Sequence, residues 1–396
     1  MTNALRPRHA PPPASDGPGW LRPWVAMLVL LFLGPALVLG WHQRESRREE
    51  QQAWQATLDP TTPDPGFPPA DDVPTDAARR VAIGFYLEAI DGLSLQDSRW
   101  TAVIDVWCRW ADDGVDDGTD DGTDDGTDDG TGDDAAFDPF DHLIAVNGRI
   151  TDRKLLDRID DGPAHYELQR LTVDFSKVFQ IVNFPLDRHL LIVSFENSAR
   201  PRQQLLFVPD TAASAVSLRA RLPGYRILRA HAMEMPHSYR TSRGRPDVPA
   251  DARATHSQPR FAIVIDRAGW GLFAKMFQAM FVAVAVALLA CFIKPIHVDP
   301  RFGLGIGALF AAVANAYLVG AHMPEGSGFS LADVVNLLGI VTILVTLAES
   351  TISLHVYESL GRPAASRMLD RVSFWTLVAC FVAVIAILLA AATSHP

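Results

Sequence analysis

Long apolar runs divide this chain into a polar middle and an apolar final third. One run lies near the start, at Pro23–Gly40, and more than 200 mostly polar residues separate it from the next. Four further runs then follow closely, at Met276–Ile293, Phe302–Ala321, Val334–Ala348 and Val372–Ala392. About 20 apolar residues are enough for a helix to span a bilayer. The pattern therefore predicts a membrane protein with an N-terminal apolar helix, a polar domain and a four-helix transmembrane bundle.

The polar middle shows a different pattern, in which apolar residues alternate with others. Alternation is clearest at Val81–Ala89 and Trp100–Trp110 and indicates half-buried strands. Further short strands are predicted at Leu143–Val146, His165–Phe175, Leu190–Glu196, Gln204–Val208, Val216–Leu222, Tyr225–Met235 and Phe261–Asp266. Short strands separated by turn residues favour an antiparallel β-sandwich. We place this sandwich at residues 76–268 and the transmembrane domain at residues 269–396.

The residues on either side of the first apolar run do not decide whether it is cleaved. Residues 1–22 carry Arg6, Arg8 and Arg22 and are expected to form a cytoplasmic tail. Residues 23–41 then fit either an uncleaved signal-anchor or a signal peptide. Residues 42–75 are rich in Gln and Glu and then in Pro and Asp, which predicts a linker.

Basic residues in the C-terminal connections orient the chain. Lys294 and Arg301 lie in the connection after the first helix of the group, and Arg362, Arg367 and Arg371 in the connection after the third. By the positive-inside rule these connections are cytoplasmic. The large domain then lies outside, in the periplasm of a bacterium, and the protein is expected to be a multi-pass protein of the inner membrane.

Charge and composition exclude several classes of function. The net charge of −11 comes from one low-complexity tract, because residues 112–134 hold 12 aspartates and without them the chain would carry +1. We interpret this Asp-Gly-Thr tract as a disordered insert; a calcium site is the alternative, but the closing glutamate of a helix-loop-helix calcium loop is missing. No basic patch interleaved with aromatic residues predicts a nucleic-acid partner.

Candidate chemistry is sparse. The three cysteines argue against a disulfide-stapled fold and a cysteine zinc site. His231 and His237 lack an evident third ligand, so no metal site is predicted. No G-x-S-x-G or H-E-x-x-H motif occurs. We therefore expect no enzymatic activity and no cofactor.

Three stretches resemble the pentameric ligand-gated ion channels, a superfamily of Cys-loop receptor-like proteins. Val81–Trp110, continued by Ala111 and Asp112, resembles the first two strands of the family with their W-x-D signature. Phe179–Glu196 resembles the F-P-x-D loop and the strand after it, and Phe261–Phe277 resembles the last strand, with Arg267 at the position of the pre-membrane arginine. No cysteines bracket the loop, as is common in prokaryotic members. The likeness covers roughly residues 76–393 and implies a homopentamer in the lipid bilayer.

The resemblance implies a coupling site between the two domains. Phe184, Pro185 and Asp187 would lie at the base of the sandwich, with a rigid turn at the proline. Asp187 and Arg267 would pair there, and the loop would push on the connection Gly320–Phe329, which contains Glu325. A solvated loop cap with an interfacial arginine is the alternative interpretation.

The second helix of the C-terminal group is the candidate pore helix. A single helical stripe of five residues would line it: Gly303, Gly307, Phe310, Ala314 and Tyr317. Five copies would form apolar rings that gate by dewetting, although small residues also favour plain helix packing. Asp299 and Arg301 flank the expected cytoplasmic mouth, where their opposite signs leave the selectivity between cations and anions open.

Ligand binding in this family occurs between subunits. The loop at residues 236–260 holds one aromatic residue, Tyr239, which is our candidate ligand contact. A mobile, solvated loop is the alternative. The sequence thus predicts a subunit of a homopentameric channel opened by a small ligand or a proton and conducting inorganic ions. A non-conducting, membrane-anchored binding or signalling protein on the same scaffold is the second hypothesis.

Overall fold

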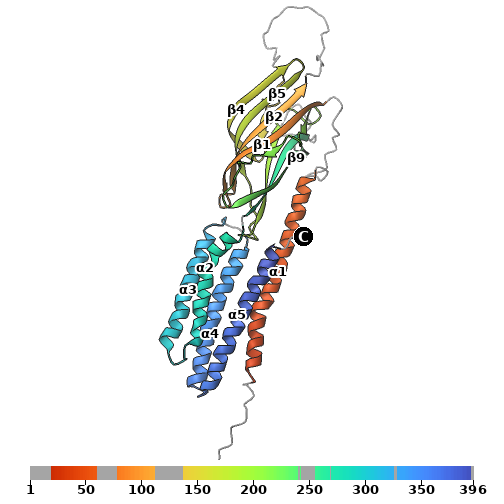
Figure 1. Ribbon diagram of the computed structural model, residues 1–396. Coiled ribbons are helices and arrows are strands. Elements are labelled where there is room, and N and C mark those ends of the chain that lie inside the picture. Colours follow the sequence, from red (N-terminus) through yellow and green to blue (C-terminus); the bar gives the residue numbers. More distant parts are fainter. Residues whose placement is uncertain are drawn as a thin grey trace, which may run out of the picture.

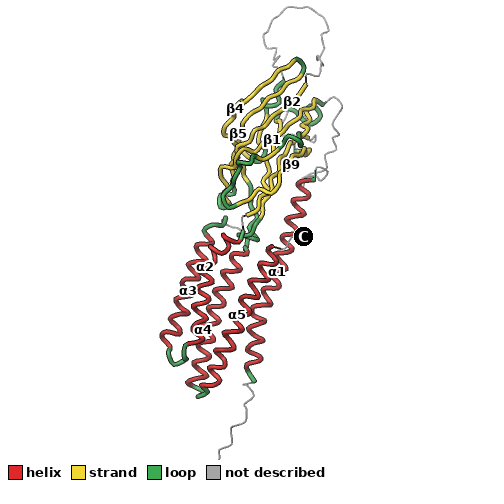
Figure 2. The backbone as a smooth tube through the Cα atoms, in the orientation of Figure 1, coloured by secondary structure: helices red, strands yellow, loops and turns green. Residues whose placement is uncertain are grey.

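The computed structural model of this chain describes residues 19–59, 78–111, 137–239, 241, 255–267, 269–324 and 328–393. They form a bundle of helices and, beyond one end of it, a domain of β-strands (Figure 1, Figure 2). Residues 1–18 of the expected cytoplasmic tail lie outside the described residues. The Asp-Gly-Thr insert at 112–134 also lies outside them.

Five helices of the described ranges are long and apolar enough to cross a membrane. They are α1 (Leu21–Leu58), α2 (Trp270–Leu288) with the short 3₁₀ helix η1 (Leu289–Phe292) after it, α3 (Val298–Gly320), α4 (Leu331–Glu358) and α5 (Pro363–Thr393). Each coincides with one of the predicted apolar runs, so the prediction of five apolar helices long enough to cross a membrane is confirmed. The two basic connections, α2–α3 and α4–α5, lie at the end of the bundle remote from the strands (Figure 1).

Helix α1 is longer than the sequence analysis predicts. Residues 42–58, expected to be linker, continue the helix, because they are rich in Gln, Glu, Arg and Ala and contain neither Gly nor Pro. Residues 60–75 of the expected linker lie outside the described residues. The membrane part of α1 packs along α5, where the Trp24 indole donates to the Ser373 hydroxyl at 2.9 Å. The bundle therefore holds five helices rather than four beside a separate anchor.

Ten strands of the described residues form two sheets. The strands are β1 (Arg79–Ser94), β2 (Arg99–Ala111), β3 (Leu143–Ala145), β4 (Gly148–Asp161), β5 (Ala164–Ser176), β6 (Arg188–Asn197), β7 (Leu205–Pro209), β8 (Ala215–Val216), β9 (Tyr225–Ser238) and β10 (Thr255–Arg267). The first sheet has the order β4-β5-β2-β1-β7, with β8 also on β1, and the second has the order β3-β6-β10-β9. Strands β7 and β8 run parallel to β1, so the first sheet is mixed, and the prediction of antiparallel pairing is wrong at this edge.

Apolar side chains from both sheets share one core. The Phe85 ring of β1 stacks on Phe195 of β6 and Phe261 of β10, with ring centroids 6.0 and 5.6 Å apart. Every second residue of β2 is buried, which explains why apolar residues alternate with others in its sequence. Gly84 of β1 lies so close to the Trp107 ring that a Cβ atom there would fall 2.1 Å from it.

Two strand predictions differ from the structure. Strand β4 was missed because it is exposed along almost its whole length and carries charges on both faces, so it shows no apolar alternation. Its partner β5 pairs with it over the full strand. Of the predicted strand Val216–Leu222, only Val216 is in a strand, the two-residue β8. The Ser217 and Leu222 carbonyls then accept hydrogen bonds in turns, from the amides of Ala220 and Tyr225.

The packing of α1 on α5 can be tested at two glycines of the same helix. A Cβ atom at Gly40 would lie 3.4 Å from Ile387, whereas one at Gly34 would meet nothing within 4 Å. We expect Gly40→Leu to lower the thermal unfolding midpoint in detergent, because overpacking of this kind costs about 1–3 kcal/mol. Gly34→Leu is the matched control and should leave the midpoint unchanged. Equal midpoints for the two variants would contradict the packing of α1.

Candidate functional site

The turn at Phe184–Asp187 lies at the junction between the strand domain and the bundle. The Phe184–Pro185 peptide bond is cis. The Phe184 amide donates to the Ile181 carbonyl at 2.9 Å, and the Leu186 amide donates to the Asn183 carbonyl at 2.7 Å. These bonds close a compact turn, as the proline predicts. The Phe184 side chain is buried in the core that the strands share with the helices.

Asp187 and Arg267 form the predicted ion pair. The Arg267 Nε donates to Asp187 Oδ1 at 2.6 Å, and its Nη2 donates to Oδ2 at 3.3 Å. The Arg267 amide also donates to the Asp187 carbonyl at 3.1 Å. Asp187 retains only 2 % of its side-chain exposure and Arg267 10 %. The pair ties the residue before β6 to the last residue of β10, where the chain enters the membrane bundle.

Two side chains that the sequence analysis missed complete this cluster. The His189 Nε2 lies 2.5 Å from Asp187 Oδ2, and the Tyr225 hydroxyl accepts a hydrogen bond from Arg267. The Arg267 guanidinium also lies over two aromatic rings, 4.5 Å from the Tyr225 centroid and 5.0 Å from that of Phe184. The only signal in the sequence was that His189 follows Asp187 by two residues.

These partners govern the charge of Asp187. Burial alone would raise the pKa of this carboxyl, but the hydrogen bond and charge of His189 and then those of Arg267 outweigh it and lower the pKa to about 2. Burial raises the pKa of the Tyr225 hydroxyl far above its ordinary value. Asp187 is therefore a carboxylate and Tyr225 a neutral phenol at neutral pH.

The turn also touches the membrane bundle directly. The amide of Leu331, the first residue of α4, donates to the Val182 carbonyl at 2.8 Å. Ser330, the residue before it, and Asp333, in the first turn, form the capping box that starts α4. The contact therefore lies at the end of the α3–α4 connection, immediately after the stretch expected from the resemblance. Glu325 lies outside the described residues.

Helix α1 reaches the same turn. The Arg47 Nη2 donates to the Leu186 carbonyl at 3.2 Å. Further along, Trp54 and Leu58 pack on a small apolar cluster of β6, β9 and β10. The sequence analysis missed this contact because it ended the helix at the membrane surface.

The five stripe residues of α3 face away from their own bundle. Gly303, Gly307, Phe310, Ala314 and Tyr317 are all exposed, with Phe310 at 74 % and Tyr317 at 80 %. The opposite face of α3 packs on α4: the Asn315 Nδ2 donates to Asn336 Oδ1 at 3.0 Å, and a Cβ atom at Gly305 would fall 2.3 Å from Leu347. The predicted stripe of α3 is therefore not covered by any other described element.

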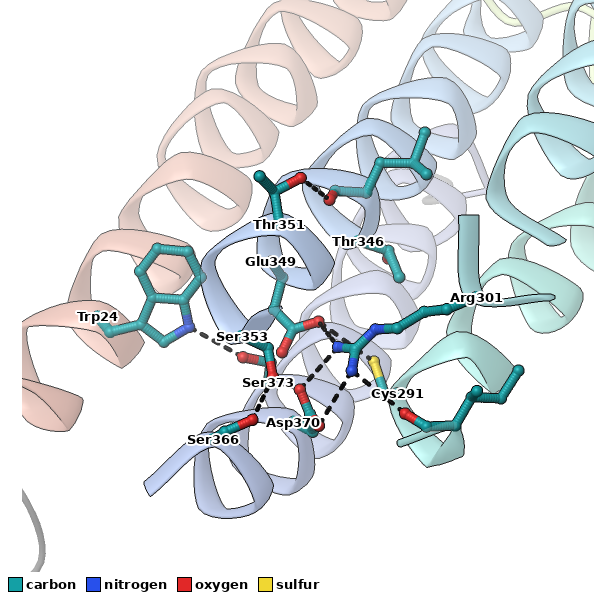
Figure 3. A network of polar contacts seen from close by, with 12 residues as sticks. Trp24, Cys291, Arg301, Thr346, Glu349, Thr351, Ser353, Ser366, Asp370 and Ser373 are labelled. Atoms are coloured by element: carbon teal, nitrogen blue, oxygen red, sulfur yellow. Dashed lines mark hydrogen bonds and ion pairs between the residues drawn. The ribbon is translucent and has the colours of Figure 1, made fainter. Parts of the chain in front are cut away.

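The two residues expected at the cytoplasmic mouth lie in different environments. Asp299 is exposed in the first turn of α3, but Arg301 has no exposed side-chain surface. Its Nη2 lies 2.7 Å from Asp370 Oδ1 and 3.3 Å from Glu349 Oε2, and its Nη1 donates to the Ile293 carbonyl at 3.2 Å (Figure 3). The expectation that Arg301 lines a mouth is wrong, because two carboxylates draw its side chain into the bundle.

Glu349 and Asp370 were missed by the sequence analysis. They come from α4 and α5, and both are buried beside Arg301 (Figure 3). Acidic residues in or next to apolar runs are rare and usually paired, and that was the available signal. The network joins α3, α4 and α5 at the end remote from the strands.

Tyr239, the candidate ligand contact, lies at the other end of the strand domain. Its hydroxyl donates to Glu196 Oε1 at 2.7 Å, and its ring meets the His256 ring edge-on at 5.5 Å between centroids. The second oxygen of Glu196 accepts from Gln258 Nε2 at 2.7 Å. This places a buried carboxylate, an imidazole and a phenol together where β6 and β9 end and β10 begins. Arg240, Arg243, Arg245 and Arg253 of the following loop lie outside the described residues.

No protein-family model and no curated protein sequence matches this chain.

Loss of the junction carboxylate should destabilise the protein strongly. We expect Asp187→Asn to cost about 3–5 kcal/mol, because it leaves the buried Arg267 guanidinium without its counter-charge. The control is Asp105→Asn, which breaks the more exposed bidentate pair with Arg170 and should cost less. Denaturant unfolding of the purified proteins at neutral pH measures both, and equal costs would contradict the role of Asp187.

The Asp187 carboxyl should also make the free energy of unfolding fall at acid pH. The folded pKa of Asp187, about 2, lies below its unfolded value near 4, so the stabilisation is complete above pH 4 and is lost as the pH falls toward 2. We expect Asp187→Asn to lack this part of the loss between pH 4 and pH 2. Unfolding curves over that range test the expectation, and parallel losses in both proteins would contradict it.

The intramembrane network gives a further prediction. Arg301→Met should destabilise the bundle by about 3–5 kcal/mol, because two carboxylates then share a buried site without a cation. Asp299→Asn, two residues away and exposed, should leave the thermal unfolding midpoint unchanged. A small effect of Arg301→Met would show that the network is solvated rather than buried.

Proposed function

We propose that this chain is a subunit of a homopentameric ligand- or pH-gated ion channel that conducts small inorganic ions across the bacterial inner membrane. The strand domain would be a β-sandwich in the periplasm. The observation that carries the proposal is the junction, where the Phe184–Asp187 turn is tied to the chain entering α2 and the adjoining Val182 carbonyl accepts from the first residue of α4. A movement of the strand domain therefore acts on both neighbours of α3.

Two neighbouring strands link the candidate ligand contact to the junction. Strands β6 and β10 are hydrogen-bonded over seven residue pairs. Glu196 and His256 lie toward one end of this pair, and Asp187 and Arg267 lie at the other. Strand geometry puts about 30 Å between the two ends. A small ligand that reorders the Tyr239–Glu196–His256 cluster would thus displace the junction through two rigid strands.

Five copies of α3 around an axis would form the pore. The uncovered stripe would supply rings of Gly303, Gly307, Phe310, Ala314 and Tyr317. A ring of Phe310 side chains would exclude water in the closed state, since apolar constrictions gate by dewetting. Asp299 would then be the charged residue at the cytoplasmic mouth, because Arg301 is held inside the bundle.

Cysteine accessibility separates a pore from a lipid-facing helix. We expect Gly307→Cys and Ala314→Cys channels, reconstituted in planar bilayers, to lose most of their current after a charged, membrane-impermeant thiol reagent. The control is Ala312→Cys, whose position is buried inside the protomer and should not react. The native Cys291 and Cys380 are buried and serve as the background.

The architecture is tested separately by particle images of the detergent-extracted protein. Five-fold rings are expected. A monomer or dimer, or pentamers that carry no current across the accessible range of voltage, pH and ligands, would contradict the channel proposal.

A second candidate function is a non-conducting, membrane-anchored binding or signalling protein on the same scaffold. Two observations favour it: the stripe of α3 is uncharged, and α1 joins the bundle as a fifth helix that also touches the strand domain. In this case the protein would form rings and would respond to ligand without current. Mass spectrometry of the mature N-terminus shows whether α1 remains in the protein.

A further inference from the structure

Arginines from four elements surround a cavity of about 270 Å³ at the junction, between α1, the strand domain and the outer ends of α2 and α5. Arg47 of α1, Arg188 of β6, Arg226 of β9 and Arg267 of β10 line it. Trp270 and Thr393, at the ends of α2 and α5, line the side toward the membrane. We call this cavity the junction pocket.

The carboxylates of the junction pocket do not balance its arginines. Asp266 accepts from Arg188 at 3.0 Å and from Arg226 at 2.9 Å, so one carboxylate serves two guanidinium groups. Arg267 is matched by Asp187, and Arg47 donates to a backbone carbonyl, that of Leu186. The four arginines and two aspartates therefore leave a net charge of +2 on the wall.

The charges beyond this wall do not remove the excess. A neighbouring cavity of about 620 Å³ shares Arg47 and Arg188 and adds one acid, Glu50, and one further arginine, Arg229. These two additions cancel each other. The excess of positive charge in the junction pocket is thus retained when the lining of the neighbouring cavity is included.

The height of the junction pocket corresponds to that of phospholipid headgroups. The apolar run of α1 ends at Gly40, α5 ends at Thr393, and α2 begins at Trp270, whose indole is 56 % exposed. Exposed tryptophans mark the membrane–water interface. The end of α5, the start of α2 and the middle of α1 meet at this level (Figure 1).

We propose that the junction pocket binds a phosphate group. Guanidinium groups bind phosphate through pairs of parallel hydrogen bonds, and several of them converge here on fixed strands and on α1. The cavity is large enough for a headgroup phosphate with its glycerol. Either an anionic phospholipid of the outer leaflet or a soluble phosphate has this chemistry. A bound phosphate would join α1 to the strand domain whether or not the protein conducts ions.

Native mass spectrometry of the purified full-length protein tests the proposal. We expect phosphatidylglycerol to be retained at collision energies that remove phosphatidylcholine. Arg47→Gln with Arg226→Gln should weaken this retention by at least fivefold, the factor that corresponds to ~1 kcal/mol for one arginine at a membrane surface. The matched control is Arg44→Gln with Arg48→Gln, which removes the same charge from α1 outside the pocket and should change retention less than twofold.

A competition arm identifies the source of the phosphate. If millimolar inorganic phosphate displaces phosphatidylglycerol from the wild type, the pocket accepts a soluble phosphate; if it does not, the ligand is the lipid headgroup. Arg226→Gln alone provides a variant that retains the Arg47–Leu186 contact, and circular dichroism checks its fold. Equal losses in the two double variants, or equal retention of phosphatidylcholine, would overturn the proposal.

Discussion

The buried pair of Asp187 and Arg267 is the constraint on which the junction depends. Both charges are buried, so each is tolerated only because the other lies within hydrogen-bond distance. His189 makes a further hydrogen bond with Asp187, and the Tyr225 hydroxyl accepts one from Arg267. The pair joins the start of β6 to the end of β10. Since α2 follows β10 almost directly, this one contact sets how the strand domain is placed over the helices.

The helices show how a bundle can present one uncovered face. Small residues and an asparagine bring α3 close to α4, while Phe310 and Tyr317 point away from the protomer. At the opposite end, Arg301 binds carboxylates of α4 and α5 and fixes the angle of α3 there. A face held in this way, without a partner among the described elements of its own chain, is what the proposed assembly of several copies requires.

Helix α1 makes the two parts of the protein less independent than the order of the chain suggests. Its apolar half lies along α5, and its polar half contacts the Phe184–Asp187 turn and the outer face of the second sheet. Any relative movement of strand domain and bundle must therefore move α1 or break its contacts.

The sequence by itself determined that this protein has five membrane-length helices and a strand domain. A helix that can cross a membrane needs a long apolar run, and a strand buried on one face needs alternating apolar residues, as in β1, β2 and β5. The Asp187–Arg267 pair was also predictable, but only through the resemblance of its loop. Tertiary structure alone decided the rest. Strand β4 exists because β5 offers it hydrogen bonds, and Arg301 turns inward because Glu349 and Asp370 meet it from two other helices. The junction pocket forms where five distant segments converge. Such contacts join residues far apart in the chain, and no local pattern records which of them will meet.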